Sequence, residues 1–249
     1  MSDDTLATNE NNYSFLIVGK SDTGKTTSYR NLRDPDGVLV INCESGKKLP
    51  FKAKMREAKL SNPLKIYSLI AKANASDKIH TIVIDSLTFL MDMVESQIVL
   101  KSEDTRGAWQ DYQQFFKKLM QEYVAVSTKN IIFTAHTAEV YNEKELATYT
   151  CVKVKGALMN NGIEAWFNNV LACKVMSTDS LEGYENNLLD ITEDDKLDGI
   201  KYVYQTRKTR DTLNERIRGP LGMWERNETF IDNDLQKVID RLHEYYGEE

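Results

Sequence analysis

The chain has 249 residues, of which 41% are hydrophobic and 28% are charged, so it can bury a core as an ordinary globular protein does. Its net charge of −6 excludes nucleic-acid binding by bulk charge, so any such site must be a local basic patch. The three cysteines are far apart and form no C-x-x-C pair, which excludes a zinc site of that kind and favours a reducing compartment.

The N-terminal segment, residues 1–12, reads MSDDTLATNENN and has neither the basic start nor the apolar core of a signal peptide. We predict a disordered leader there, followed by one domain over residues 13–249. No apolar run is long enough to cross a membrane. We therefore expect a cytoplasmic protein without a membrane partner.

The first predicted strand, FLIVG, leads directly into a glycine-rich loop. Gly19, Gly24, Lys25 and Thr26 have the spacing G-x-x-x-x-G-K-T of a phosphate-binding loop, and a helix is predicted from about Lys25 to the RDPDG turn. We expect backbone N–H groups of the loop to surround the β-phosphate of ATP. Lys25 would reach the β- and γ-phosphates, and the Thr26 hydroxyl would bind Mg²⁺. The predicted nucleotide-binding residues are Gly19, Lys20, Ser21, Asp22, Thr23, Gly24, Lys25, Thr26 and Thr27.

Further strands and helices alternate along the chain. Continuous apolar runs predict strands at 38–42, 80–85, 130–136, 168–176 and 200–206. Helical spacing predicts helices at 64–74, from about Thr88, at 109–124 and at 232–249. This alternation indicates an α/β fold, in which helices flank a mostly parallel central sheet.

Polar residues stand at the ends of three of these strands, at the edge of a parallel sheet where ligands bind. Asp85 ends the strand at 80–85 and is the predicted second Mg²⁺ ligand beside Thr26, although an aspartate there can also cap a helix. Glu44 follows the strand at 38–42, which we expect beside the P-loop strand. It is the candidate that orients or deprotonates the attacking water, and a solvated loop glutamate is the alternative. His136 could sense the γ-phosphate or be structural.

The order of these segments resembles the RecA-like ATPase core. The resemblance is carried by VLVINCESGKK, with its glutamate between the two Walker motifs, by the Asp-Ser pair in IVIDSLTFL, and by IIFTAHT. Over roughly residues 13–220 the chain is similar to compact phage-encoded RecA-like ATPases of the Sak-four type, often labelled AAA family, through INCESGKK, IVIDSLT, NIIFTAHT and KVKGALMNNGIEAWFNNVLA. The resemblance implies a Mg²⁺-dependent ATPase acting on single-stranded DNA in phage-type recombination, annealing or replication, in the host cytoplasm.

The resemblance also implies roles for particular residues. Glu44 would be the catalytic glutamate, and His136 falls at the place of a polar γ-phosphate sensor, where RecA itself has glutamine. Residues 137–156 fall at a mobile DNA-binding loop, and 100–110 is a second candidate loop. Their basic and aromatic side chains suit stacking and phosphate contact: Arg106, Tyr141, Lys144, Tyr149, Lys153 and Lys155. Three glutamates of the first loop weaken this interpretation, and an ordinary surface loop is the alternative.

Two charged segments follow in the second half of the chain. In RKTR, Lys208 and Arg210 match residues that reach the γ-phosphate of a neighbouring subunit, which would require a homo-oligomer, either a ring or a filament. A solvated hairpin face is the alternative. The acidic insertion at 177–199 could mimic DNA, recruit a single-strand-binding protein, or be merely solvated.

Because of Lys20, a second class of ATPase remains an alternative. Partition and positioning ATPases have a lysine at this loop position that crosses a dimer interface, but a glycine pair follows it, where this chain has Ser21 and Asp22. Asp22 suggests instead a local ion pair with Lys20. A nucleotide-dependent assembly protein without DNA binding is a further alternative, whereas a small-molecule kinase would need an Arg-rich lid that the sequence does not offer.

Overall fold

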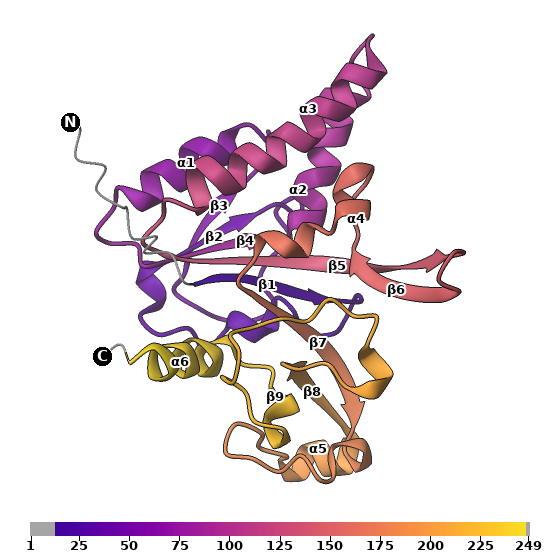
Figure 1. The fold of residues 1–249 in the computed structure, drawn as a ribbon. Helices are drawn as coiled ribbons and strands as arrows, with labels where there is room; N and C mark the ends of the chain where they lie inside the picture. Colours follow the sequence, from indigo (N-terminus) through magenta and orange to yellow (C-terminus); the bar gives the residue numbers. More distant parts are fainter. Residues whose placement is uncertain (1–12, 248–249) are drawn as a thin grey trace, which may run out of the picture.

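The computed structural model describes residues 13–247, so the leader predicted over 1–12 lies outside the described residues. Its strands are β1 (Ser14–Gly19), β2 (Val38–Asn42), β3 (Arg56–Lys59), β4 (Thr81–Asp85), β5 (Asn130–Asn142), β6 (Ala147–Val152), β7 (Asn169–Ser177), β8 (Ile200–Gln205) and β9 (Phe230–Asp232). They form one sheet in the order β3-β2-β4-β5-β1-β7-β8-β9, with β6 paired to β5 (Figure 1).

The six strands from β3 to β7 in this order run parallel to one another, whereas β6 is antiparallel to β5, β8 to β7, and β9 to β8. The apolar runs predict these central strands well, because a strand covered on both faces must be apolar at every position. In β5, Ile131, Ile132 and Phe133 are fully buried. The predicted mostly parallel sheet flanked by helices is confirmed.

Helices cover both faces of the sheet. One face carries α1 (Lys65–Asn74), α2 (Leu87–Val94) and α3 (Thr105–Lys118), and α6 (Leu235–Tyr246) covers the other (Figure 1). Two short helices are α4 (Ala157–Asn161) and α5 (Glu193–Asp198). Turns of π-helix extend α2 and α3 over Glu95–Val99 and Leu119–Val124, and 3₁₀ turns lie at Thr27–Tyr29, Pro35–Gly37, Ile163–Trp166, Asp179–Leu181, Arg210–Thr212 and Asn227–Thr229. No helix of the described residues is long and apolar enough to span a membrane.

The position of β2 corrects one prediction. We expected this strand beside the P-loop strand β1, but β4 and β5 lie between them. Neighbours in sequence are not neighbours in the sheet here, because β5 pairs with β1 on one side and with β4 on the other. Glu44 nevertheless reaches the ligand edge, since the carboxyl ends of all parallel strands meet there.

The segment after the glycine-rich loop corrects a second prediction. In place of the helix expected from Lys25, one 3₁₀ turn over Thr27–Tyr29 follows the loop. Consecutive hydroxyl residues are weak helix formers, and Ser28 Oγ donates to the Lys25 carbonyl oxygen at 2.6 Å. The chain then adopts a left-handed conformation at Asp34 and turns at Pro35. The loop therefore has no long helix behind it.

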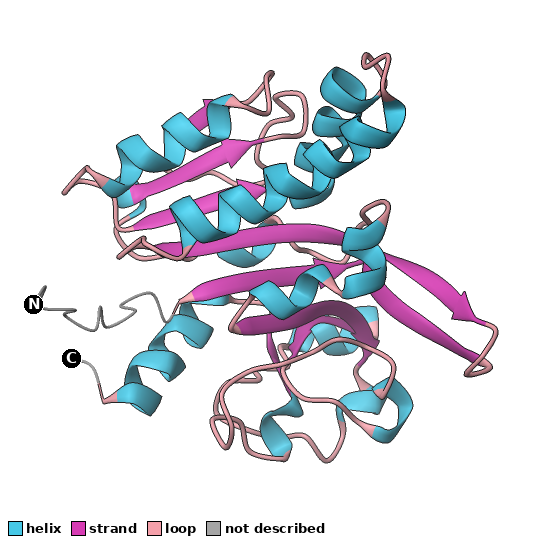
Figure 2. Cartoon of the chain, turned by 45° about the horizontal axis from the view of Figure 1, so that its top comes forward, coloured by secondary structure: helices cyan, strands magenta, loops and turns pink. Residues whose placement is uncertain are grey.

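Three short strands were not predicted, and one of them changes a candidate site. The edge strand β3 reads REAK, which lacks an apolar pattern, and β9 has only three residues. Residues 137–156 were expected to be a mobile loop, but most of them form a hairpin, because β5 continues to Asn142 and pairs with β6. Figure 2 shows this hairpin projecting beyond the rest of the sheet.

Candidate nucleotide-binding site

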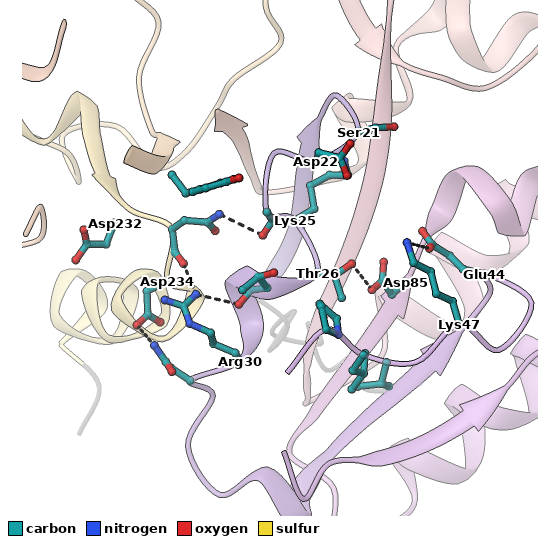
Figure 3. Close-up of a pocket in the computed structure, with 18 of the residues that line it drawn as sticks. Ser21, Asp22, Lys25, Thr26, Arg30, Glu44, Lys47, Asp85, Asp232 and Asp234 are labelled. Carbon is teal, nitrogen blue, oxygen red and sulfur yellow. Dashed lines mark hydrogen bonds and ion pairs between the residues drawn. The ribbon is translucent and has the colours of Figure 1, made fainter. Parts of the chain in front are cut away.

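A cleft of about 1000 Å³ opens over the glycine-rich loop, at the carboxyl edge of the parallel strands (Figure 3). The loop residues that line it are Ser21, Asp22, Gly24, Lys25, Thr26 and Thr27. Glu44 and Asp85 line it from the ends of β2 and β4, and His136 lines it from within β5, level with Gly19 at the end of β1. The structure thus brings together Glu44, Asp85, His136 and most of the loop that the sequence singled out, although His136 is not at the end of its strand as predicted.

Lys25 is folded back onto its own loop. Its Nζ donates to the carbonyl oxygens of Gly19, at 3.1 Å, and of Lys20, at 2.6 Å. Burial lowers the pKa of the ammonium group. Phosphate oxygens would supply stronger, charge-assisted hydrogen bonds than these two carbonyl groups. The lysine is therefore placed for an anion that enters the loop.

The Asp85 carboxylate accepts hydrogen bonds from three hydroxyl groups in the cleft. Its Oδ2 accepts from Thr26 Oγ1 at 2.9 Å and from Tyr29 OH at 2.7 Å, and its Oδ1 accepts from Thr134 Oγ1 at 2.5 Å. The hydroxyl and carboxylate oxygens predicted as Mg²⁺ ligands thus lie in hydrogen-bond contact. Helix capping, the alternative role, is not seen, because Ser86 is the N-cap residue of α2.

These two oxygen donors fit Mg²⁺ in the way that nucleotide sites hold it. Mg²⁺ keeps several waters and takes one or two protein oxygens together with phosphate oxygens. Among the described residues no cluster of three or more His, Cys, Asp or Glu side chains could hold a metal by itself. Thr26 and Asp85 therefore suit a metal shared with a bound phosphate.

Glu44 and His136 lie close together in the cleft. His136 Nε2 lies 4.0 Å from Glu44 Oε1, and Lys47 Nζ lies 3.8 Å from Glu44 Oε2. Burial raises the pKa of Glu44, and the negative charge of Asp85 raises it further. Burial and the nearby Lys25 lower the pKa of His136, so its imidazole is neutral at pH 7. A half-buried carboxylate in the cleft of the phosphate loop is suited to accept a hydrogen bond from water.

Lys20 is engaged within its own chain. Its Nζ lies 2.8 Å from Glu139 Oε1, at the root of the hairpin, rather than beside Asp22 as the sequence suggested. The Lys20 side chain is 73% exposed and does not line the cleft. Hydrogen bonding to Glu139 raises the pKa of Lys20.

The opposite wall of the cleft comes from the last third of the chain and was missed by the sequence analysis. It consists of Asp190, Asp195, Lys201, Tyr202, Asp232, Asn233, Asp234 and Lys237. The acidic insertion thus contributes two carboxylates to this wall, and Asp195 is paired with Lys201 at 2.8 Å. No local motif marks these residues. Thr134, the β5 residue that donates to Asp85, was also missed, but it could have been noticed as a polar residue within an apolar strand.

The candidate nucleic-acid residues lie outside the cleft. Tyr141 and Lys144 are exposed near the hairpin tip, whereas Tyr149 donates a hydrogen bond to Glu145. Lys153 is exposed, Lys155 pairs with Glu95 at 2.6 Å, and Arg106 is exposed in the first turn of α3. Lys208 and Arg210 are exposed and do not line the cleft of their own chain.

Comparison with known proteins adds one finding. A family model described as AAA domain matches residues 11–213, which include the glycine-rich loop, Glu44, Asp85 and His136. No curated protein matches the chain.

Proposed function

The chain belongs to the AAA domain family of nucleotide-binding P-loop proteins, and on this premise we propose that it is a Mg²⁺-dependent ATPase that acts on single-stranded DNA in phage-type recombination, annealing or replication. The observation that carries the ATPase proposal is the meeting of Lys25, Thr26, Asp85 and Glu44 in one cleft. A phosphate loop alone suits binding, whereas the half-buried Glu44 carboxylate in the same cleft also suits hydrolysis.

In the proposed mechanism, the loop amides bind the β-phosphate and Lys25 moves from the carbonyl oxygens of Gly19 and Lys20 to the phosphates. Thr26 and Asp85 would hold Mg²⁺, which when bound neutralises charge on the β- and γ-phosphates. Glu44 orients a water for attack on the γ-phosphorus and accepts its proton, while the bond from the γ-phosphorus to the β–γ bridging oxygen breaks and ADP leaves. His136, neutral and 4.0 Å from Glu44, donates its ring N–H to a γ-phosphate oxygen and so registers the occupied site.

The DNA part of the proposal is supported by the projecting hairpin and by the family resemblance. The hairpin exposes Tyr141 beside Lys144, a pairing that suits base stacking next to phosphate contact. Glu139, one of the acidic residues that oppose DNA binding, is neutralised by Lys20 at 2.8 Å. The first strand of the hairpin is the continuation of β5, which also contains His136. DNA contact and nucleotide contact would therefore share one strand.

The test is ATP hydrolysis by the wild type and by Glu44→Gln, each with and without short single-stranded DNA. We expect DNA to stimulate the wild type and Glu44→Gln to lose about 10²- to 10⁴-fold in rate, because the amide cannot accept the proton. ATP binding by Glu44→Gln should persist. Hydrolysis indifferent to DNA would contradict the DNA role and favour an assembly or partition ATPase, and full activity of Glu44→Gln would contradict the mechanism.

A further inference from the structure

The C-terminal segment holds the part of the chain that follows the phosphate loop. We call residues 230–246, which form β9, a turn and α6, the C-terminal clamp; they lie beyond residue 213, where the family match ends. Arg33 pairs with Asp240 through two hydrogen bonds of 2.7 Å, and Asn31 Nδ2 donates to Asp234 Oδ2 at 2.7 Å. The clamp is therefore fixed directly against the short 3₁₀ turn that replaces the expected helix.

One side chain of the clamp touches the loop itself. Asn233 Nδ2 donates to the carbonyl oxygens of Gly24, at 3.1 Å, and of Thr23, at 3.4 Å. Asn233 is only 6% exposed, and its Oδ1 accepts a weak hydrogen bond from Cys173 Sγ at 3.9 Å. A Cβ atom at Gly24, where φ is +85°, would lie 2.4 Å from Asn233 Nδ2. The Asn233 amide thus packs against the loop and leaves no room for a side chain at Gly24.

Asn233 helps to fix the direction of the loop amides: it donates to the Thr23 carbonyl oxygen, and at the Gly24 carbonyl oxygen it adds a second hydrogen bond to the one from Ser28 N–H at 2.9 Å. In a planar trans peptide the N–H of the next residue points away from the carbonyl oxygen. Holding the Thr23 and Gly24 carbonyls toward Asn233 therefore turns the N–H groups of Gly24 and Lys25 the other way, into the loop. Such inward amides are what a phosphate loop uses to bind the β-phosphate.

We propose that Asn233 is a positioning residue of the nucleotide site, which sets the Gly24 and Lys25 amides of the loop for the β-phosphate. This inference rests on the proposed function and assigns to the clamp a task that most P-loops leave to the helix behind the loop. Here that helix is a single 3₁₀ turn, which gives the loop one hydrogen bond, from Ser28 N–H to the Gly24 carbonyl oxygen, and Asn233 of the clamp adds two more.

The experiment measures the Kd of ADP, which has a β-phosphate, and of AMP, which lacks one, by titration calorimetry. The variants are Asn233→Ala and the isosteric Asn233→Asp, and Asn227→Ala is the matched control, because Asn227 bonds the Glu185 carbonyl away from the cleft. We expect ADP binding to weaken on the order of tenfold in Asn233→Ala, since two hydrogen bonds are lost, and further in Asn233→Asp, whose carboxylate would face two carbonyl oxygens. AMP binding should stay within about twofold, because the amides concerned serve the β-phosphate.

Thermal unfolding of the nucleotide-free variants checks that they fold, and steady-state hydrolysis should show a raised KM for ATP at a nearly unchanged kcat. ADP binding like the wild type in both Asn233 variants, or an equal loss for AMP, would overturn the inference. Unfolding of both variants would do so too, because Asn233 would then be a residue of general stability. A wild type that binds no ADP would instead overturn the proposed function and this inference with it.

Discussion

Three hydroxyl groups hold the Asp85 carboxylate: Asp85 is 6% exposed, and Thr26, Tyr29 and Thr134 donate to it. If Thr26 and Asp85 hold Mg²⁺ as proposed, Thr26 would turn from this carboxylate toward the metal, whereas Tyr29 and Thr134 can stay. The two remaining hydrogen bonds would then orient the carboxylate, as the groups behind metal ligands do in other sites.

Tyr29→Phe is therefore expected to raise the Mg²⁺ concentration needed for half-maximal binding of ATP by about fivefold, the effect of one hydrogen bond of about 1 kcal/mol. The ring stays buried and only the hydroxyl that orients Asp85 is lost. A Mg²⁺ titration of fluorescent ATP-analogue binding measures this. The control is Tyr67→Phe, whose hydroxyl donates to the Phe115 carbonyl outside the cleft. Equal Mg²⁺ requirements in all three proteins would refute the prediction.

The pKa of Glu44 predicts the acid side of the pH profile. Burial and the charge of Asp85 raise this pKa above the ordinary 4.5, and Glu44 must be ionised to accept a proton. As pH decreases, kcat should fall when Glu44 becomes protonated. We expect this fall at a higher pH than for an enzyme whose catalytic glutamate is fully exposed. Lys47, 3.8 Å away, lowers the pKa, so Lys47→Gln should move the acid limb upward, and Lys52→Gln, on an exposed residue outside the cleft, should not. An acid limb that Lys47→Gln leaves in place would argue against Glu44 as the base.

At the scale of elements, the sequence predicts what local patterns determine. The loop from Gly19 to Thr26 has fixed spacing, and the apolar runs before Glu44, Asp85 and His136 bring all three to one edge of the sheet. The rest depends on long-range packing. Asn233 and Gly24 are 209 residues apart in the chain, and no periodicity reveals their contact. The same holds for β3, whose charged sequence is tolerated because it lies at the exposed edge of the sheet.

The hairpin of β5 and β6 leads to a prediction about DNA. We expect Tyr141→Ala to weaken binding of short single-stranded DNA by about 1–3 kcal/mol, the effect of losing one stacked base. Lys144→Ala should also weaken it and lower the slope of log Kd against log salt by about 0.7. KM for ATP should not change, because neither residue lines the cleft. Lys72→Ala, at an exposed position of α1, is the control. Unchanged DNA affinity in both hairpin variants would remove the hairpin from the DNA proposal, and gel shifts at low salt provide the measurement.

At the scale of the whole molecule, Lys208 and Arg210 lie outside the nucleotide cleft of their own chain. If these residues act on a neighbour, two inactive proteins should complement each other. A mixture of Glu44→Gln with the double variant Lys208→Ala, Arg210→Ala should regain up to about a quarter of the wild-type ATPase rate, because random head-to-tail assembly pairs an intact site with an intact neighbour at that frequency.

The control mixture combines Glu44→Gln with Lys25→Ala. Both changes lie in the same cleft, so no pairing of subunits restores a complete site and no activity should return. Complementation absent from the first mixture would place Lys208 and Arg210 outside the catalytic assembly.

A clamp that positions the phosphate loop would also affect how tightly an incomplete, growing chain can bind nucleotide. The ribosome makes Lys25 early and Asn233 more than two hundred positions later, and chains of this size begin to fold while they grow. A nascent chain that ends after β8 already contains Glu44, Asp85 and His136, but its phosphate loop still lacks the amide that orients it. If Asn233 positions the loop as proposed, ATP would stabilise such an intermediate less than it stabilises the chain in which α6 has docked, because the intermediate binds ATP more weakly.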